Sequence, residues 1–201
     1  MSEEADKESR GPQVDAALVR SFQAGNKAAF DKLVLKHKDR IFNLCFRFLG
    51  DYQEANDSAQ EVFVKAYRSL KGFRFESVFG TWLHRIAVNT CKNKVKSLEY
   101  RYAKKMVYLD NPGAVQDTRG LEISDETQSP LAELEKKERM QLIQRAIESL
   151  PPEQKMVVIL RDIQGLPYDD IADITGYGLG TVKSRLSRAR LELRRELMKV
   201  I

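Results

Sequence analysis

Cysteine and histidine are scarce in this chain, with two of each among 201 residues. Cys45 and Cys91 fit neither a paired-thiol nor a zinc-binding spacing, which argues against a disulfide framework and favours a reducing compartment. His37 and Cys45 fall on one apolar helical stripe, so we interpret both as core residues rather than ligands. The opening segment MSEEADKESRGPQ has no apolar core, and no apolar run approaches the roughly 20 residues that a membrane span needs. We therefore expect a soluble cytoplasmic protein without membrane insertion, metal or other cofactor.

Alternating strand patterns are also missing, whereas apolar residues recur at helical spacing along most of the chain. The sequence therefore predicts an all-α fold. Its 42% hydrophobic and 31% charged residues are enough for one medium domain or two small ones. The net charge of +5 and the pI near 9.1 favour nucleic acid or another anionic surface as a partner.

Helical patterns fill the front half of the chain. A short one, VDAALVRSFQAG, precedes a longer one that runs from Asn26, a good N-cap, to Gly50. A third covers residues 54–70, with its apolar residues on one face, and a fourth starts at Thr81. These segments predict a small helical bundle.

The stretch from Asp110 to Pro130 has no apolar period and carries five acids against one Arg. This composition is typical of a mobile linker, which would span roughly 25 Å if flexible. We therefore divide the chain into a disordered tail over 1–13, a front helical domain over 14–105, a flexible acidic linker over 106–130 and a second helical domain over 131–201.

Three glycines crowd the stretch TGYGLGTVKSRLSRAR, residues 175–190. A Walker loop needs Gly-Lys-Ser/Thr after a strand and a dinucleotide loop needs Gly-x-Gly-x-x-Gly, so neither phosphate-binding motif fits. A helix-turn-helix does fit. YDDIADIT forms its first helix, the small Ala172 permits a close crossing, Gly176 supplies the turn and Thr181 can cap the second helix.

The second helix of this motif is strongly basic, with seven Lys/Arg and two Glu over residues 181–199. The N-terminal end of a recognition helix reaches base edges in the major groove, where phosphates also approach. A solvated, charged C-terminal helix is the alternative. Because the turn residues stand in their expected places, we favour DNA binding by Thr181, Lys183, Ser184, Arg185 and Arg188.

Two features of the front domain are candidates for binding. The 54–70 helix carries a polar patch on the side opposite its apolar stripe: Glu54, Asp57, Gln60 and Glu61. Taken alone, a patch of this kind is more often a solvated surface than a binding site. Next comes a glycine-bounded loop in which aromatic side chains alternate with one basic side chain: Phe73, Arg74, Phe75, Phe79 and Trp82. The helix that follows has a polar and basic face: Arg85, Asn89, Lys92 and Lys96.

Aromatic rings beside a basic stripe suit unpaired DNA, because bases stack on rings at about 1–3 kcal/mol each while phosphates supply a sequence-independent attraction. The alternative is that these apolar residues build a small core. Trp82 fits both interpretations equally.

The segment GLPYDDIADITGYGLGTVKSRLSRARLELRREL resembles the region 4 helix-turn-helix of extracytoplasmic-function sigma factors, in the bacterial sigma-70 family. The similarity extends upstream through AIESLPPEQKMVVILRD. A second block, EANDSAQEVFVKAYRSLKGFRFESVFGTWLHRIAVNTCKN, resembles region 2. Phe75, Gly80 and Gly178 depart from residues that are common at their positions in the family.

The resemblance implies a promoter-specificity subunit of RNA polymerase. Region 2 would bind the clamp helices of the polymerase large subunit through Glu54, Asp57, Gln60 and Glu61. It would also hold the melted −10 element, with one base flipped into the loop that contains Glu76, Ser77 and Val78. The remaining −10 contacts implied are Arg74, Trp82, Arg85, Asn89, Lys92 and Lys96, and region 4 would read the −35 duplex.

Two other classes of function stay open at this point. A helix-turn-helix regulator with a sensing front domain would bind DNA without core polymerase, and usually as a dimer. An enzyme is disfavoured, because the two histidines are well separated and no nucleophile motif occurs. We expect no homo-oligomer. The sigma family often has an anti-sigma factor, which makes one a candidate partner here.

Overall fold

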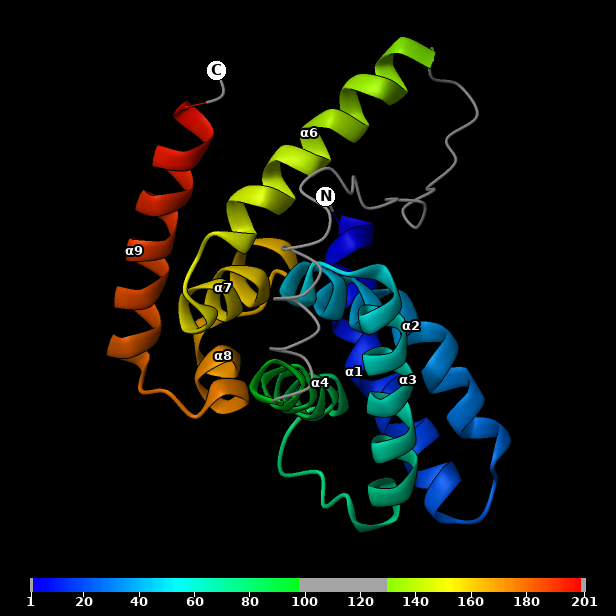
Figure 1. The fold of residues 1–201 in the computed structure, drawn as a ribbon. Coiled ribbons are helices and arrows are strands. Elements are labelled where there is room, and N and C mark those ends of the chain that lie inside the picture. Colours follow the sequence, from blue (N-terminus) through cyan, green and yellow to red (C-terminus); the bar gives the residue numbers. More distant parts are fainter. Residues whose placement is uncertain (1, 98–129, 200–201) are drawn as a thin grey trace.

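The computed structural model describes residues 2–97 and 130–199, and every element in these ranges is helical (Figure 1). The all-α prediction is thus confirmed. The front module contains α1 (Ser2–Gln23), α2 (Ala28–Leu49), α3 (Tyr52–Ser69), the 3₁₀ turn η1 (Leu70–Gly72) and α4 (Phe79–Lys96). The second contains α6 (Pro130–Glu148), α7 (Pro152–Val158), the π segment η2 (Ile159–Ile163), α8 (Tyr168–Thr175) and α9 (Leu179–Met198). The predicted linker over 106–130 lies outside the described residues, except for Pro130, which begins α6.

Helix α1 differs from the prediction of a disordered tail over 1–13, because the structure has a helix from Ser2 onward. Glu3, Glu4, Ala5, Lys7 and Glu8 of this segment are residues with high helix propensity. Lys36 Nζ on α2 donates to the carbonyl oxygen of Gly11 at 2.9 Å and to the Asp15 carboxylate at 2.6 Å. This helix was not predicted, because the prediction relied on a periodic row of apolar residues, whereas polar contacts hold the segment against α2.

The turns between the front helices follow local signals in part. Gly50 ends α2 in the left-handed region at φ 77°, as predicted, and the Asp51 side chain accepts the N–H of Glu54 at 2.8 Å to cap α3. The predicted N-cap at Asn26 is wrong. Its side-chain amide instead donates to Ser21 Oγ at 3.1 Å, at the end of α1, and α2 begins without a side-chain cap.

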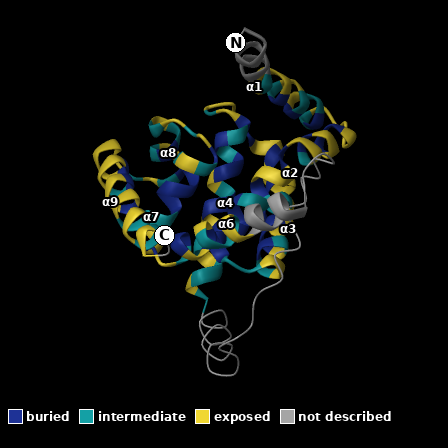
Figure 2. Cartoon of the chain, turned by 90° about the horizontal axis from the view of Figure 1, so that it is seen from above, coloured by how far each residue is buried: buried dark blue, intermediate teal, exposed yellow. Residues whose placement is uncertain are grey.

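Helix α2 is the central helix of the front module and packs against α1, α3 and α4. Leu33, Ile41 and Leu44 are fully buried on it, and each such side chain stabilises the fold by about 1.5–3 kcal/mol. His37 and Cys45 are buried on the same helix, which confirms that they are core residues. Figure 2 shows how the buried residues line the inner faces of the helices while the outer faces stay exposed.

The second module is built around α7 and η2, where Met156, Ile159 and Leu160 are fully buried. Pro152 lies in the first turn of α7, where its missing N–H costs no helical hydrogen bond, as predicted. Gly176 ends α8 at φ 74° and provides the predicted turn into α9.

The two modules pack directly against each other. Buried Arg47 of α2 donates to Gln144 Oε1 of α6 at 3.1 Å, and the amide of Gln164 after η2 donates to the carbonyl oxygen of Arg40 at 3.3 Å. Helix α8 packs against α4 (Figure 1). The buried apolar residues therefore form one continuous cluster through both modules.

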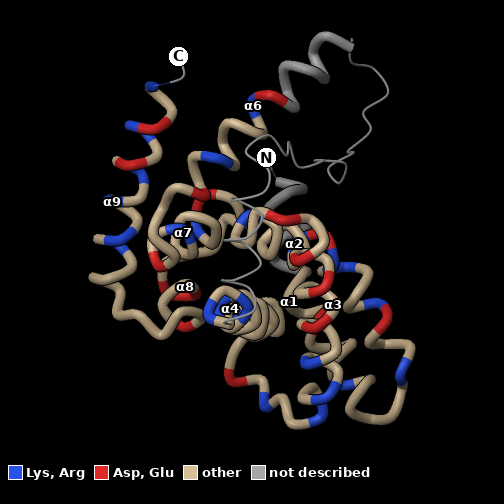
Figure 3. Tube along the Cα trace, in the orientation of Figure 1, with Lys and Arg blue, Asp and Glu red and all other residues tan. Residues whose placement is uncertain are grey.

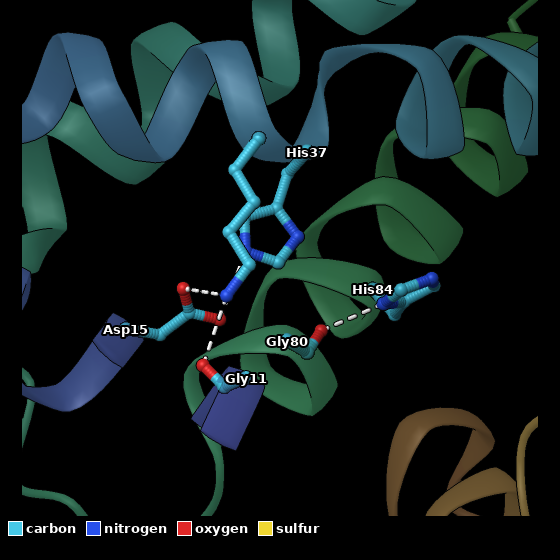
Figure 4. A network of polar contacts seen from close by, with 6 residues as sticks. Gly11, Asp15, His37, Gly80 and His84 are labelled. Carbon is cyan, nitrogen blue, oxygen red and sulfur yellow. Dashed lines mark hydrogen bonds and ion pairs between the residues drawn. The ribbon is translucent and has the colours of Figure 1, made fainter. Parts of the chain in front are cut away.

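Two buried polar groups of the front module, Asp15 and His84, favour different charge states: Asp15 is ionised and His84 is neutral (Figure 4). Burial acts to raise the pKa of Asp15, but hydrogen bonds from His37 Nε2, at 3.0 Å, and from Lys36 outweigh it, and the pKa is lowered. His84 Nδ1 donates to the carbonyl oxygen of Gly80 at 2.7 Å. Burial lowers the pKa of His84, so its neutral form is favoured in the folded protein.

The lowered pKa of His84 predicts a loss of stability in mild acid. The unfolded chain takes up a proton near the ordinary histidine value of 6.5 and the folded chain takes it up only at lower pH. The free energy of unfolding should thus fall between pH 7 and pH 5, with a slope from this residue of up to about 1.4 kcal/mol per pH unit. Asp15 contributes its change only below its ordinary value of 3.8.

Urea unfolding at pH 7, 6 and 5 measures this slope in the wild type and in His84→Gln. The variant should show a flatter dependence on pH, whatever its stability at pH 7. Equal slopes for the two proteins would contradict the assignment.

Candidate nucleic-acid interface

Helix α9 carries the second module's candidate DNA contacts, and Figure 3 shows the Lys and Arg positions along it. Val182, Leu186 and Ala189 are buried against the module and fix the rotation of the helix. This rotation places the predicted DNA contacts on the outer side of the helix. Arg185 is half-buried, and the other four are exposed: Thr181, Lys183, Ser184 and Arg188.

The start of α9 differs from the prediction that Thr181 caps it. The helix begins at Leu179, after Gly178, so Thr181 lies inside the first turn. Its carbonyl oxygen accepts the hydroxyl of Ser184 at 3.1 Å. Arg190, further along, forms a two-point ion pair with Asp162, whose Nε–Oδ2 distance is 3.0 Å, and thereby holds α9 to η2.

Helix α4 carries the front module's basic face. Leu83, Ala87 and Cys91 are buried in the front core, which leaves the opposite side of the helix to the polar residues. Arg85, Asn89 and Lys96 are exposed there, and Lys92 is half-buried. The structure therefore brings the four predicted helix residues onto one face.

The aromatic residues before and within α4 form a continuous group. Phe73 and Phe79 are buried, and the half-buried Trp82 lies against them with ring centroids 5.2 and 5.7 Å apart. Phe75 packs edge-on against Phe73 at 5.0 Å and keeps 36% of its surface exposed. Trp82 is thus part of the core and also reaches the surface, so both interpretations of this residue hold geometrically.

The loop between η1 and α4 contains the other predicted −10 residues. Arg74 and Glu76 are exposed, Ser77 is half-buried and Val78 is 46% exposed. Val78 directly precedes α4, and the N–H of Trp82 bonds to its carbonyl oxygen at 3.1 Å. The loop therefore leads straight into the basic face of the helix.

Tyr177 lies between the two sets of candidate DNA contacts. The Arg185 guanidinium of α9 sits 3.9 Å from the centre of its ring, and the Lys92 ammonium of α4 sits 5.2 Å from it. Both are cation–π contacts. One ring thus holds a predicted −35 residue and a predicted −10 residue in the same place.

The polar patch of α3 divides into paired and unpaired residues. Glu54 forms an ion pair with Lys94 of α4 at 2.6 Å, and this hydrogen bond raises the pKa of Lys94. Glu61 pairs with Lys65 at 2.7 Å within the helix. Among the described residues, the side chain of Asp57 has no ion-pair or hydrogen-bond partner.

Several of these residues were not predicted from the sequence. Tyr177 lies in a turn that we interpreted only through its glycines, and Lys94 falls off the predicted basic stripe. The partners that reveal their roles, Lys92 for Tyr177 and Glu54 for Lys94, are distant in sequence, so only the packing of the helices brings them together.

Two further findings concern the described ranges alone. Within residues 2–97 and 130–199, no three metal-binding side chains of His, Cys, Asp or Glu type come together. None of the helices there combines the length and the apolar character needed to cross a lipid bilayer.

Comparison with known proteins identifies both modules. Residues 33–101 match the model of Sigma-70 region 2, and residues 140–193 match that of Sigma-70, region 4. The chain is 40% identical over 176 residues to the RNA polymerase sigma-H factor of Pseudomonas aeruginosa, covering 88% of this chain and 90% of that protein. It is 38% identical over 182 residues to the ECF RNA polymerase sigma-E factor of Escherichia coli K12, with coverage of 88% and 90%. The chain belongs to the extracytoplasmic-function (ECF) sigma factors of the sigma-70 family.

This ECF sigma factor shares its fold with two solved structures. The structure of CnrH in complex with the cytosolic domain of CnrY aligns with a TM-score of 0.66 at 23% identity, over 92% of this chain and 98% of that one. The sigma factor RpoE of Bartonella quintana, solved with the anti-sigma factor NepR, gives 0.61 at 24% identity, over 85% and 97%. The function is that of an RNA polymerase sigma factor, and the regulator acting without polymerase is not favoured.

The exposed residues of α9 predict two different mutant phenotypes. Arg188→Ala should weaken −35 binding by roughly 1–3 kcal/mol and relax base preference, because an arginine at a base edge discriminates between bases. Lys183→Ala, near the helix start, should weaken binding to all sequences and lower the salt slope by about one. Titrations of specific and random duplex at several salt concentrations distinguish the two. Equal losses on both duplexes for Arg188→Ala would refute its placement in the groove.

Proposed function

We propose that this ECF sigma factor uses α9 to read the −35 duplex, α4 with its preceding loop to hold the melted −10 element, and the exposed side of α3 to dock on core RNA polymerase. The observation that carries this division is the pairing of a basic helix face with an aromatic loop on α4, in a module separate from α9. Duplex and unpaired DNA need different surfaces, and the two modules offer one of each.

The −10 element meets two kinds of contact in this proposal. Arg85, Asn89 and Lys96 offer a row of donors to phosphates, which attracts any sequence. Trp82 and Phe75 of the loop of residues 73–78 offer partly exposed ring surface for an extruded base. Unstacking a base costs a few kcal/mol, and capture of that base by the loop offsets part of the cost.

The −35 element is duplex, and an α-helix fits its major groove. The buried stripe of α9 keeps Ser184 and Arg188 on the outside, where Arg188 can address base edges. Lys183 and Thr181 lie nearer the helix start, where backbone amides and cations face phosphates. The Arg190–Asp162 pair keeps the helix attached to its module and takes no part in reading bases.

The two DNA faces cannot act together while the modules are packed as described. Promoter elements named −35 and −10 lie about 25 base pairs apart, which is roughly 85 Å of straight duplex at about 3.4 Å per base pair. Lys92 and Arg185 meet on the ring of Tyr177. Promoter binding therefore requires α8 and α9 to move away from α4, and Tyr177 to release both cations.

Docking on polymerase is proposed to centre on Asp57 and Gln60. Glu54 is held by Lys94 and Glu61 by Lys65, so both support the patch and contribute charge. Asp57 and Gln60 are exposed and can pair with arginine or lysine on the basic coiled-coil clamp of the polymerase large subunit.

Control of the factor is proposed to involve an anti-sigma protein, since two structural relatives are solved with such a partner or with a partner's cytosolic domain. The site of action is proposed to be the cytoplasm, where polymerase and promoters are found. The protein acts by binding, and no residue is assigned a catalytic role.

Reversal of the charge at Asp57 tests the docking surface. Asp57→Lys should leave the bundle folded, because the side chain is exposed. Loss of one partner of a buried charge pair costs about 2–5 kcal/mol, so affinity for core polymerase should fall at least tenfold. Titration against core polymerase, with run-off transcription in parallel, measures the loss.

The matched control is Asp31→Lys, which makes the same charge change at an exposed position of α2 and should bind core normally. Wild-type binding by Asp57→Lys would remove this residue from the interface. Failure of the wild-type protein to bind core would refute the proposed docking altogether.

Removal of the ring at Tyr177 tests whether it restrains the DNA faces. A cation–π contact is worth about 0.5–1 kcal/mol at exposed sites, and the contact with Lys92 is the one that joins Tyr177 to α4, so its loss should tighten binding of the free protein to single-stranded −10 DNA by about twofold to fivefold. Tyr177→Leu removes the ring and Tyr177→Phe retains it. Fluorescence anisotropy with a labelled oligonucleotide should show tighter binding for Tyr177→Leu alone. Identical affinities for all three proteins would exclude a restraining role for the ring.

A further inference from the structure

The side chain of Gln23, at the end of α1, reaches across to the segment that enters the −10 loop. Its Nε2 donates to the carbonyl oxygen of Phe73 at 2.9 Å and to that of Leu70 at 3.1 Å, with the carbonyl oxygen of Lys71 at 3.4 Å. An amide nitrogen has two hydrogens, so the two shorter contacts use its full donor capacity. A helix almost 50 residues earlier in sequence thus holds the 3₁₀ turn η1 and the residue that follows it.

The position of Gln23 is itself fixed by the core. The neighbouring Phe22 is buried and packs against the rings of Phe30 and Tyr67, with centroids 5.7 and 5.3 Å away. The end of α1 therefore cannot shift without disturbing an aromatic cluster that joins α1, α2 and α3.

The loop beyond these carbonyls adopts a restricted conformation. Phe75 has φ 59°, and it is the one non-glycine residue with a positive φ in the described residues. L-residues with a Cβ disfavour this region, so such a conformation persists only where surrounding contacts impose it. The ring of Phe75 is held between Phe73, at 5.0 Å, and the guanidinium of Arg20, at 5.1 Å.

We propose that Gln23 and Arg20 of α1 are positioning residues for base capture, which hold the loop of residues 73–78 in the conformation that accepts the extruded −10 base. The inference rests on the proposed role of this loop. Neither side chain needs to touch DNA. Gln23 fixes the loop where it begins and Arg20 covers the ring of Phe75 at the strained residue.

An ordered loop should favour base capture without changing phosphate binding. A loop ordered before DNA arrives avoids the entropy cost of ordering at the moment of binding. Phosphate contacts along α4 do not depend on the loop, because Arg85, Asn89 and Lys96 are fixed by the helix. Loss of Gln23 should therefore weaken capture of the base while sparing the general attraction for the strand.

Gln23→Glu is the sharpest variant, because it keeps the shape and replaces the donor with a carboxylate facing three carbonyl oxygens. The assay uses holoenzyme made from core polymerase and the full chain. The probe is a fork-junction DNA taken from a fragment that wild-type holoenzyme transcribes, with each non-template −10 base replaced in turn by an abasic site. Wild-type holoenzyme should lose the most affinity when the base at one particular position, the captured base, is missing.

The expected result concerns that position. On intact DNA, Gln23→Glu should bind more weakly than wild type by roughly fivefold to a hundredfold, the range that loss of one stacked base produces. On DNA that is abasic at that position, the two proteins should bind alike. Gln13→Glu makes the same charge change at an exposed site of α1 and should behave as wild type on both probes. Gln23→Met, similar in size and uncharged, should repeat the loss and serves if the glutamate variant does not fold.

Three outcomes separate the explanations. Equal weakening on intact and abasic DNA, or loss of affinity for core polymerase, would make Gln23 a merely structural residue and overturn the inference. Wild-type behaviour of both Gln23 variants would also overturn it while leaving the proposed function intact. A wild-type holoenzyme with no abasic-sensitive position would refute base capture itself.

Discussion

Helix α4 packs on two sides and leaves a third, basic side exposed, and this constraint organises the molecule. Leu83, Ala87 and Cys91 fill the front core. His84 is buried where the second module approaches, and Thr81 hydrogen-bonds Asp170 of α8. The face with Arg85 and its neighbours is all that remains. The rotation of the helix is therefore set by apolar packing, and the orientation of the basic face follows from it.

The contact between the modules uses groups that also suit DNA. Burial, together with the nearby carboxylates of Asp173 and Asp169, raises the pKa of Asp170, which shows that α8 concentrates negative charge beside α4. Lys92 meets an aromatic ring of the second module instead of a nucleobase. Under the proposed function the second module and the promoter compete for this surface, and the balance between them should respond to salt because phosphate contacts weaken as ionic strength rises.

Helix periodicity and turn chemistry were sufficient to predict much of this structure. The apolar stripes gave the helices of both modules, and Gly50, Pro152 and Gly176 stand where the turns require them. Asn26 and Thr181 failed as caps because a side chain with a good capping propensity can find another partner or fall inside the first turn. The tail over 1–13 was missed because propensity and polar contacts support that helix.

The candidate site was predictable only as far as one helix or one loop at a time. Arg85, Asn89 and Lys96 share a face by spacing alone, so the sequence sufficed for them. The contacts of Tyr177 with Lys92 and of Gln23 with Phe73 join segments far apart in the chain. No local pattern contains that information, because it arises when modules and helices pack. Whether each predicted residue touches DNA stays a prediction.

The π segment η2 sets the direction in which the residues after it face. The N–H of Gln164 bonds to the carbonyl oxygen of Ile159 at 2.9 Å, five residues back, so the helix holds one residue more in this turn than regular winding would. Each residue of an α-helix advances the direction of the side chains by about 100°, since a turn holds about 3.6 residues. If the same residues were wound as a regular α-helix, all that follows would be rotated by about that angle. Gln164 would no longer face α2, and α8 would present a different side to α4, so a single inserted residue determines how the two modules fit together.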